Sequence, residues 1–211
     1  MPVKIPACLR ARIRSANNRP FVRSFLGHRK AREGIPIETE RLLLREWQKS
    51  DREPFARLNA DPRVMEFMPA RLSPAESGLL ADRIENHFRE RGFGLYALEL
   101  RYERTFIGYV GLSVPAFQAH FTPCVEIGWR LSARHWGRGL ATEAARRIVR
   151  FAFESLMLDA LVSFTVPANI RSRRVMEKIG MTHDPSDDFE HPNLPEDHPL
   201  RCHVLYRLRR P

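Results

Sequence analysis

Cysteine is scarce in this chain of 211 residues, and its three copies stand far apart. They form no C-x-x-C pair, so the sequence predicts neither a disulfide framework nor a cysteine-rich zinc site. Long hydrophobic runs are missing as well. The most apolar stretch, 151–166, is interrupted by Glu154 and Asp159, whereas a membrane-spanning helix needs roughly 18 uninterrupted apolar residues. We therefore expect a cytoplasmic protein with no membrane partner. The three cysteines are Cys8, Cys124 and Cys202.

Acidic residues are nearly absent from residues 1–36, where nine Lys and Arg side chains are opposed by Glu33 alone. Residues 37–211 hold 26 basic and 24 acidic side chains, so most of the net charge of +10 belongs to this arm. Prolines interrupt any long helix in it. We expect residues 1–36 to be a loosely ordered basic extension. An arm that contacts nucleic acid or the ribosome, and an organellar targeting segment, are the alternatives.

The remainder, residues 37–211, is long enough for one globular domain and alternates strand-like with helix-like segments. Apolar alternation predicts strands over 37–46, 95–101, 105–114, 123–131, 161–166, 181–184 and 203–209. Helical periodicity and capping signals predict helices over 51–60, 74–91, 138–156 and 169–179. Ser73 with Glu76 indicates a capping box for the second of these helices, and Asn169 is expected to be the cap of the last. The order β-α-α-β-β-β-α-β-α-β-β indicates an α/β fold with a mixed, partly antiparallel sheet.

A strand exit rich in glycine leads into the strongest helix of the chain. Gly137 and Gly139 permit positive φ angles, and the first N–H groups of the following helix, with its dipole, would form an anion site suited to a diphosphate. The spacing is not that of a P-loop, and Thr142 stands where a dinucleotide-binding loop needs its third small residue. A plain glycine-eased turn between strand and helix is the alternative.

Two segments resemble motifs of the GNAT superfamily of N-acetyltransferases. Residues 134–139, RHWGRG, are similar to the R-x-x-G-x-G/A diphosphate motif of that family. Residues 169–181 look like its N-x-x-S-x-R-x-x-E-K-x-G-F segment, with Met181 in place of the aromatic residue. ETERLLLR at 38–45 and WGRG at 136–139 resemble the ribosomal-protein alanine N-acetyltransferases of the RimJ/RimL type. The resemblance covers about residues 37–209 and leaves the basic arm unexplained.

This resemblance implies the GNAT form of the α/β fold, with helices on both faces of the sheet, and acetyl-CoA as co-substrate without a metal. It implies that the backbone of Trp129, Arg130 and Leu131 pairs with the pantetheine arm, and that Asn169 bonds the pantetheine amides. The other residues that would bind the cofactor are Arg134, Trp136, Gly137, Arg138, Gly139, Leu140, Ala141 and Thr142.

Catalysis by direct transfer in a ternary complex needs a neutral amine. At pH 7 the deprotonation of a lysine-like amine costs about 4.6 kcal/mol and that of a protein α-amine about 1 kcal/mol, so an α-amine needs less help. Glu126 is the best-placed general base, with a solvated strand position as the alternative. The resemblance implies that Ser172 reprotonates the departing thiolate; alternatively, it only satisfies backbone groups in the first helical turn.

The leading hypothesis is therefore an N-acetyltransferase acting on a protein N-terminal α-amine, as a monomer or dimer. The alternatives are acetylation of a small amine, such as an amino acid, polyamine or aminoglycoside, and a non-catalytic acyl-CoA-binding module. A loop rich in acid and histidine, 184–202, is expected to receive a cationic amine through Asp187, Asp188 and Glu190 rather than to bind metal. Tyr206 is expected in the core or on the sheet surface rather than as the catalytic acid.

Overall fold

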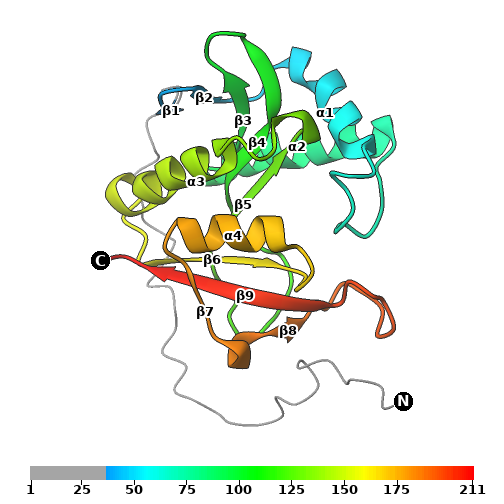
Figure 1. Cartoon of the computed structure of the whole chain (residues 1–211), viewed down its shortest axis with the longest axis vertical. Coiled ribbons are helices and arrows are strands. Elements are labelled where there is room, and N and C mark those ends of the chain that lie inside the picture. Colours follow the sequence, from blue (N-terminus) through cyan, green and yellow to red (C-terminus); the bar gives the residue numbers. More distant parts are fainter. Residues whose placement is uncertain (1–36) are drawn as a thin grey trace.

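The computed structural model describes residues 37–211, and the predictions for residues 1–36 lie outside the described residues (Figure 1). The strands form a mixed sheet in the order β1-β2-β3-β4-β5-β6-β9-β7, with β8 paired to β9. Within this described part, β5 and β6 are parallel and the other neighbours are antiparallel. The strands are β1 (Ile37–Glu38), β2 (Leu42–Arg45), β3 (Leu95–Leu100), β4 (Thr105–Ser113), β5 (Glu126–Leu131), β6 (Ala160–Thr165), β7 (Thr182–His183), β8 (Phe189–Glu190) and β9 (Cys202–Arg209).

The four predicted helices are present, and local capping explains where they begin. They are α1 (Arg52–Ala60), α2 (Pro74–Arg91), α3 (Leu140–Arg150) and α4 (Ile170–Lys178). Ser73 and Glu76 form a reciprocal capping box at the start of α2, where each side chain accepts a hydrogen bond from the backbone N–H of the other residue. None of the helices in residues 37–211 is long and apolar enough to cross a bilayer.

Several predicted boundaries were wrong. The strand predicted over 37–46 is split, because the chain turns where the Thr39 N–H donates to the Leu42 carbonyl. The strand predicted from residue 123 begins at Glu126, since Pro123 has no N–H to offer a ladder. The helix predicted over 138–156 starts two residues later, and its last turn is a π-helical segment, Phe151–Ser155. The short strand β8 was not predicted.

Helices cover both faces of the sheet, as the resemblance implied (Figure 1). Neighbouring residues of β4 show this, because successive side chains of a strand point to opposite faces. Tyr109 packs with the buried residues of α1 and α2, whereas Val110 belongs to the larger core that contains the apolar face of α3. The sheet therefore separates two apolar layers, and β5 lies between α3 on one face and the α1–α2 side on the other.

Candidate functional site

Strands β5 and β6 pair over a short stretch and then diverge. Their pairing is confined to Glu126 opposite Val162, where the Val162 N–H donates to the Val125 carbonyl at 2.9 Å. On its other edge, β5 pairs with β4 from Glu126 to Leu131. Beyond Glu126 the edge of β5 that faces β6 therefore has no strand beside it in the described part of the chain.

Trp129 directs its main-chain groups to this open edge. The Ser132 N–H donates to the Ile107 carbonyl of β4 at 2.8 Å, which fixes the alternation of the antiparallel ladder. By that alternation the N–H and C=O groups of Arg130 point to β4, and those of Trp129 point away from it. An open strand edge of this kind can pair with an extended ligand through its main chain.

The turn before α3 is built to leave N–H groups unused. Gly137 and Gly139 have φ angles of 73° and 79°, a region that favours glycine. The Glu143 N–H donates to the Gly139 carbonyl at 3.0 Å, so the three preceding N–H groups have no acceptor within the helix. No side chain of residues 37–211 caps them. Together with the positive end of the helix dipole, they can bind a diphosphate.

Arg41, in the turn between β1 and β2, contacts the turn before α3. Its Nη1 donates to the Arg138 carbonyl at 3.0 Å, and its Nε and Nη2 lie 2.7 and 2.6 Å from Oε2 of Glu143. The Thr39 hydroxyl donates to Oε1 of the same carboxylate at 2.5 Å. Although burial opposes ionisation, the hydrogen bonds from Thr39 and Arg41 hold the pKa of Glu143 below its ordinary value. The carboxylate in the first turn of α3 is thus ionised, and its negative charge is balanced by Arg41.

The opposite wall of the site is the start of α4. The side-chain oxygen of Asn169 accepts a hydrogen bond from the Ser172 N–H at 3.2 Å, and its nitrogen donates to Thr165 Oγ1 at 3.0 Å. Asn169 is therefore the helix cap that was predicted. Within residues 37–211 the Ser172 hydroxyl makes no hydrogen bond, and the residue lines the cavity described next. This hydroxyl is available to a ligand.

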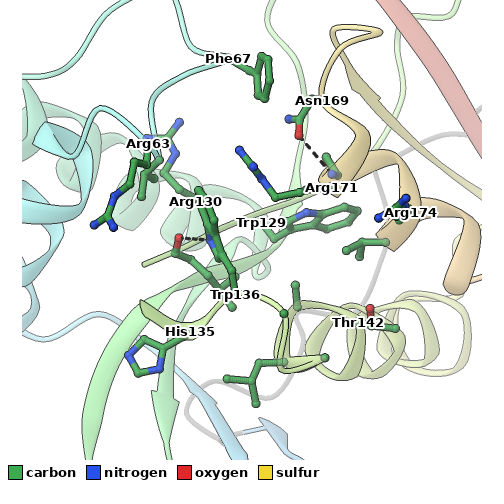
Figure 2. A pocket seen from close by; sticks show the side chains of 18 of the residues that line it. Arg63, Phe67, Trp129, Arg130, His135, Trp136, Thr142, Asn169, Arg171 and Arg174 are labelled. Carbon is green, nitrogen blue, oxygen red and sulfur yellow. Dashed lines mark hydrogen bonds between the residues drawn. The ribbon is translucent and has the colours of Figure 1, made fainter. Parts of the chain in front are cut away.

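One cavity of about 350 Å³ joins these elements (Figure 2). Of the predicted site residues, the ones that line it are Trp129, Arg130, Leu131, Trp136, Gly137, Gly139, Leu140, Ala141, Thr142, Asn169 and Ser172. Glu126, Arg134 and Arg138 are not among the lining residues. Those that the sequence reasoning missed are Arg63, Val64, Phe67, Met68, His135, Arg171, Arg174, Val175 and Lys178. Four of the nine lie in the α1–α2 connection, for which no motif was recognised.

Glu126 lies at the point where β5 and β6 separate. Its side chain is partly buried and accepts a hydrogen bond from the Ser113 hydroxyl at 3.2 Å. Burial raises the pKa of Glu126 to about 7, against the opposing effect of that hydrogen bond. This environment differs from that of a fully solvated strand position, and it suits a group that exchanges a proton near neutral pH.

Cys124 and Tyr206 do not line this cavity. Burial raises the pKa of the Cys124 thiol to about 12, so its thiolate is scarce at neutral pH. The Tyr206 hydroxyl donates to Glu177 at 3.0 Å and the ring is buried, as predicted for a core residue. No group of three His, Cys, Asp or Glu side chains in residues 37–211 is arranged to hold a metal ion.

The carboxylates of the acidic loop are paired with neighbouring side chains and do not line the cavity. Asp187 pairs with Arg207 at 2.6 Å, and Asp188 lies 2.7 Å from Nε2 of His183. Glu190 pairs with Arg201 at 3.1 Å. None of these three carboxylates lines the cavity. These carboxylates are thus already paired with nearby cations and a histidine within the C-terminal half, and their expected contact with a cationic amine stays a prediction.

Comparison with known proteins agrees with this geometry. The acetyltransferase (GNAT) domain family matches residues 41–182. YnaD of Bacillus subtilis, named as an uncharacterized N-acetyltransferase, is 31% identical over 146 residues, which cover 69% of this chain and 81% of YnaD.

Two solved structures share the fold. The ribosomal-protein-S5-alanine acetyltransferase of Vibrio fischeri is 16% identical, with a TM-score of 0.66, and the match covers 83% of this chain and 96% of that one. The microcin C7 self-immunity acetyltransferase MccE, solved in complex with acetyl-CoA and AMP, is 14% identical, with a TM-score of 0.66 and coverage of 82% and 94%.

Proposed function

The chain belongs to the GNAT family of N-acetyltransferases, and on that premise we propose that residues 37–211 transfer the acetyl group of acetyl-CoA to a protein N-terminal α-amine. One observation carries the cofactor assignment: the unused N–H groups at the start of α3 lie in the same cavity as the open edge of β5. A diphosphate bound by these N–H groups and an extended pantetheine paired with the open edge of β5 would account for both features of the cavity.

The cofactor would lie along the cavity from α3 to β5. The N–H groups of Gly137 to Ala141 would hold its diphosphate, and the main chain of Trp129 would pair with the pantetheine. Asn169, at the start of α4, would bond the pantetheine amides with the hydrogen-bonding capacity that its cap interactions leave. MccE, which shares the fold, was solved with acetyl-CoA bound, and this supports the assignment.

The reaction would proceed by direct attack. A neutral amine forms the C–N bond at the thioester carbonyl, and the C–S bond breaks to release the coenzyme A thiolate. Glu126 would accept the proton of the amine through a water molecule, because its pKa of about 7 leaves much of it ionised at neutral pH. Ser172 would donate a proton to the thiolate and take one back from solvent water, and N–H groups of β5 would stabilise the negative charge on the carbonyl oxygen.

A protein α-amine is the acceptor that this machinery serves best. Its ordinary pKa of about 7.8 leaves a useful neutral fraction near pH 7, whereas a lysine amine of pKa about 10.4 needs a stronger base. The V. fischeri protein that shares the fold is an acetyltransferase for the alanine of ribosomal protein S5. The sequence similarity to the RimJ/RimL type points the same way.

Two measurements test the proposal. Calorimetric titration of the full chain with coenzyme A should show binding, and Gly139→Glu should abolish it, because this change puts bulk and negative charge at the anion site. Thiol release from acetyl-CoA should then be faster with peptides bearing free N-termini than with polyamines or aminoglycosides. Binding that Gly139→Glu leaves unchanged would contradict the placement of the diphosphate.

A further inference from the structure

Arg130 has an unusual position among the cations of the cavity. Its side chain is partly buried and lines the cavity, yet its guanidinium has no carboxylate partner in residues 37–211. Its contacts are neutral: Nη1 donates to Asn59 Oδ1 at 2.6 Å, Nη2 lies 3.0 Å from the Met68 sulfur, and the group lies 5.5 Å from the centre of the Tyr109 ring. The full positive charge is therefore left uncompensated inside a cavity, where a counter-anion is favourable.

These contacts also fix the guanidinium in place. Asn59 is fully buried, and its amide nitrogen donates to the buried Ser77 hydroxyl at 2.8 Å, so its oxygen is held toward Arg130. Two of the five N–H donors of Arg130 are engaged in this way, and three are left for a ligand. A guanidinium with its orientation already set loses little entropy when it binds a planar anion.

The other cations of the cavity are accounted for. Arg63 pairs with Asp61 at 2.7 Å, and Arg171 pairs with Glu66 at 2.7 Å. Arg174 and Lys178 belong to α4, which faces the start of α3 and the proposed diphosphate site. Figure 2 shows Arg130 and Arg63 on the side of the cavity away from Arg174 and Thr142. Arg130 therefore lies at the end of the cavity that the cofactor phosphates would not occupy.

We propose that Arg130 binds a carboxylate carried by the acceptor close to its amine, so that the enzyme selects acidic acceptors. This inference rests on the proposed function. Trp129 and Arg130 are consecutive in β5, so their side chains point to opposite faces of the sheet, toward the α3 core and toward α1 respectively. An acceptor held by Arg130 would approach the open edge of β5 from the α1–α2 side, opposite the face that α3 covers.

The same charge would help the chemistry. A fixed guanidinium a few ångströms from an ammonium lowers the pKa of that ammonium, which increases the neutral fraction of the acceptor. It would also repel acceptors that carry several positive charges, such as polyamines. The acceptor carboxylate therefore both anchors the molecule and offsets this repulsion.

The test compares acceptors that differ in one charge. Thiol release from acetyl-CoA by the full chain is measured with hexapeptides that begin Ala-Glu or Ala-Gln and are otherwise identical, and with β-alanine or its amide. We expect kcat/KM to be about tenfold higher for the carboxylate member of whichever pair is turned over. The peptide and small-amine pairs together identify which kind of acceptor carries the carboxylate.

Variants then assign the preference to Arg130. Arg130→Gln should remove the difference in kcat/KM between paired acceptors. Arg63→Gln is the matched control: it makes the same charge change in the same cavity at a cation that already has a carboxylate partner, so the preference should persist. Arg130→Lys keeps the charge without the planar fork, and it should retain part of the preference.

Equal kcat/KM for the paired acceptors of the wild-type chain would overturn the inference, and this comparison does not require any variant to fold. A preference that survives in Arg130→Gln would overturn it as well. Coenzyme A binding with turnover but without charge preference leaves the proposed function standing. Failure to bind coenzyme A, or to release thiol with any amine, would instead remove the proposed function, and the inference with it.

Discussion

The burial of Glu126 leads to a prediction about how activity depends on pH. Because burial raises its pKa to about 7, a fall in pH below 7 protonates the group that would accept the amine proton. We expect kcat/KM to decline below about pH 7, and Glu126→Gln to lower kcat by about 100-fold and to remove this limb. The amine of the acceptor titrates too, so acceptors with different amine pKa values serve as the control. If the acceptor amine causes the fall in kcat/KM at low pH, the pH of that fall should change with the pKa of the amine. If Glu126 causes it, that pH should stay the same for all acceptors.

The same carboxyl makes a prediction about stability. Its pKa in the folded chain lies above its ordinary value of 4.5, so the folded state binds more protons than the unfolded state between about pH 4.5 and 7. Its contribution to the free energy of unfolding should therefore fall by up to about 3 kcal/mol as the pH rises through this range. Urea unfolding at pH 5 and pH 8 should show that Glu126→Gln gains stability relative to wild type at the higher pH. If the difference in the free energy of unfolding between wild type and Glu126→Gln is the same at both pH values, Glu126 is not buried enough to have a raised pKa.

A substitution at Ser172 can distinguish a catalytic role from a structural one. Its hydroxyl makes no hydrogen bond within residues 37–211, whereas its backbone N–H is held by Asn169. Ser172→Ala should therefore leave Tm and the Kd for acetyl-CoA unchanged and lower kcat by about tenfold or more, as expected for loss of a proton donor. Single-turnover rates with titration of acetyl-CoA would measure both. An unchanged kcat would show that the hydroxyl takes no part in the reaction.

The charge of Glu143 in the first turn of α3 is balanced by residues of the turn between β1 and β2. Glu143 occupies a position that favours helix formation, since an acidic side chain stabilises a helix N-terminus, but its charge would repel a diphosphate there. Arg41 and Thr39 of the β1–β2 turn neutralise it and hold the Arg138 carbonyl at the same time. The proposed anion site would therefore depend on both segments.

Arg41→Gln should expose this dependence. We expect the Kd for coenzyme A to rise about tenfold, because Glu143 regains an unbalanced negative charge beside the diphosphate. Glu143→Gln in the same background should recover part of the affinity, since it removes that charge. Pantetheine, which lacks the diphosphate, is the control ligand, and its binding should change little. Equal losses for the two ligands would indicate general damage to the cavity instead.

Short-range signals were read correctly from the sequence, and long-range ones were not. The Ser73 capping box, the positive φ of Gly139 and the Asn169 cap depend on residues within one turn of the chain, so their spacing reveals them. Arg130 and Asn59 meet across 71 residues, and Arg41 and Glu143 across 102. No local pattern reports such pairs. The contribution of the α1–α2 connection was missed for this reason.

Family membership determines the fold and the type of activity, but the acceptor depends on structural features that differ between members. The S5-alanine acetyltransferase and MccE share this fold and carry names that imply different acceptors, so shared architecture does not identify the substrate. In this chain the features outside the recognised motifs are the cavity wall from the α1–α2 connection, the uncompensated Arg130 and the basic arm. Acceptor choice is therefore best sought in these three features.

The arm can be tested apart from the catalytic body because the charges divide unequally between them. Residues 1–36 have a net charge of +8 and residues 37–211 only +2, whereas the described residues that line the cavity all lie between 63 and 178. Deletion of residues 1–36 should leave kcat and the Kd for coenzyme A unchanged. If the arm contacts RNA, the full chain should bind ribosomal RNA with an affinity that falls steeply with salt, and the deletion should remove most of that affinity.

Filter-binding assays over about 50 to 200 mM salt would measure this dependence. A variant that keeps residues 1–36 but replaces Arg10, Arg12 and Arg14 with Gln is the control for chain length, and it should lower the salt slope without affecting turnover. Loss of turnover in the deletion would mean that the arm completes the site. Equal RNA affinity with and without the arm would mean that its charge does not select a nucleic-acid partner.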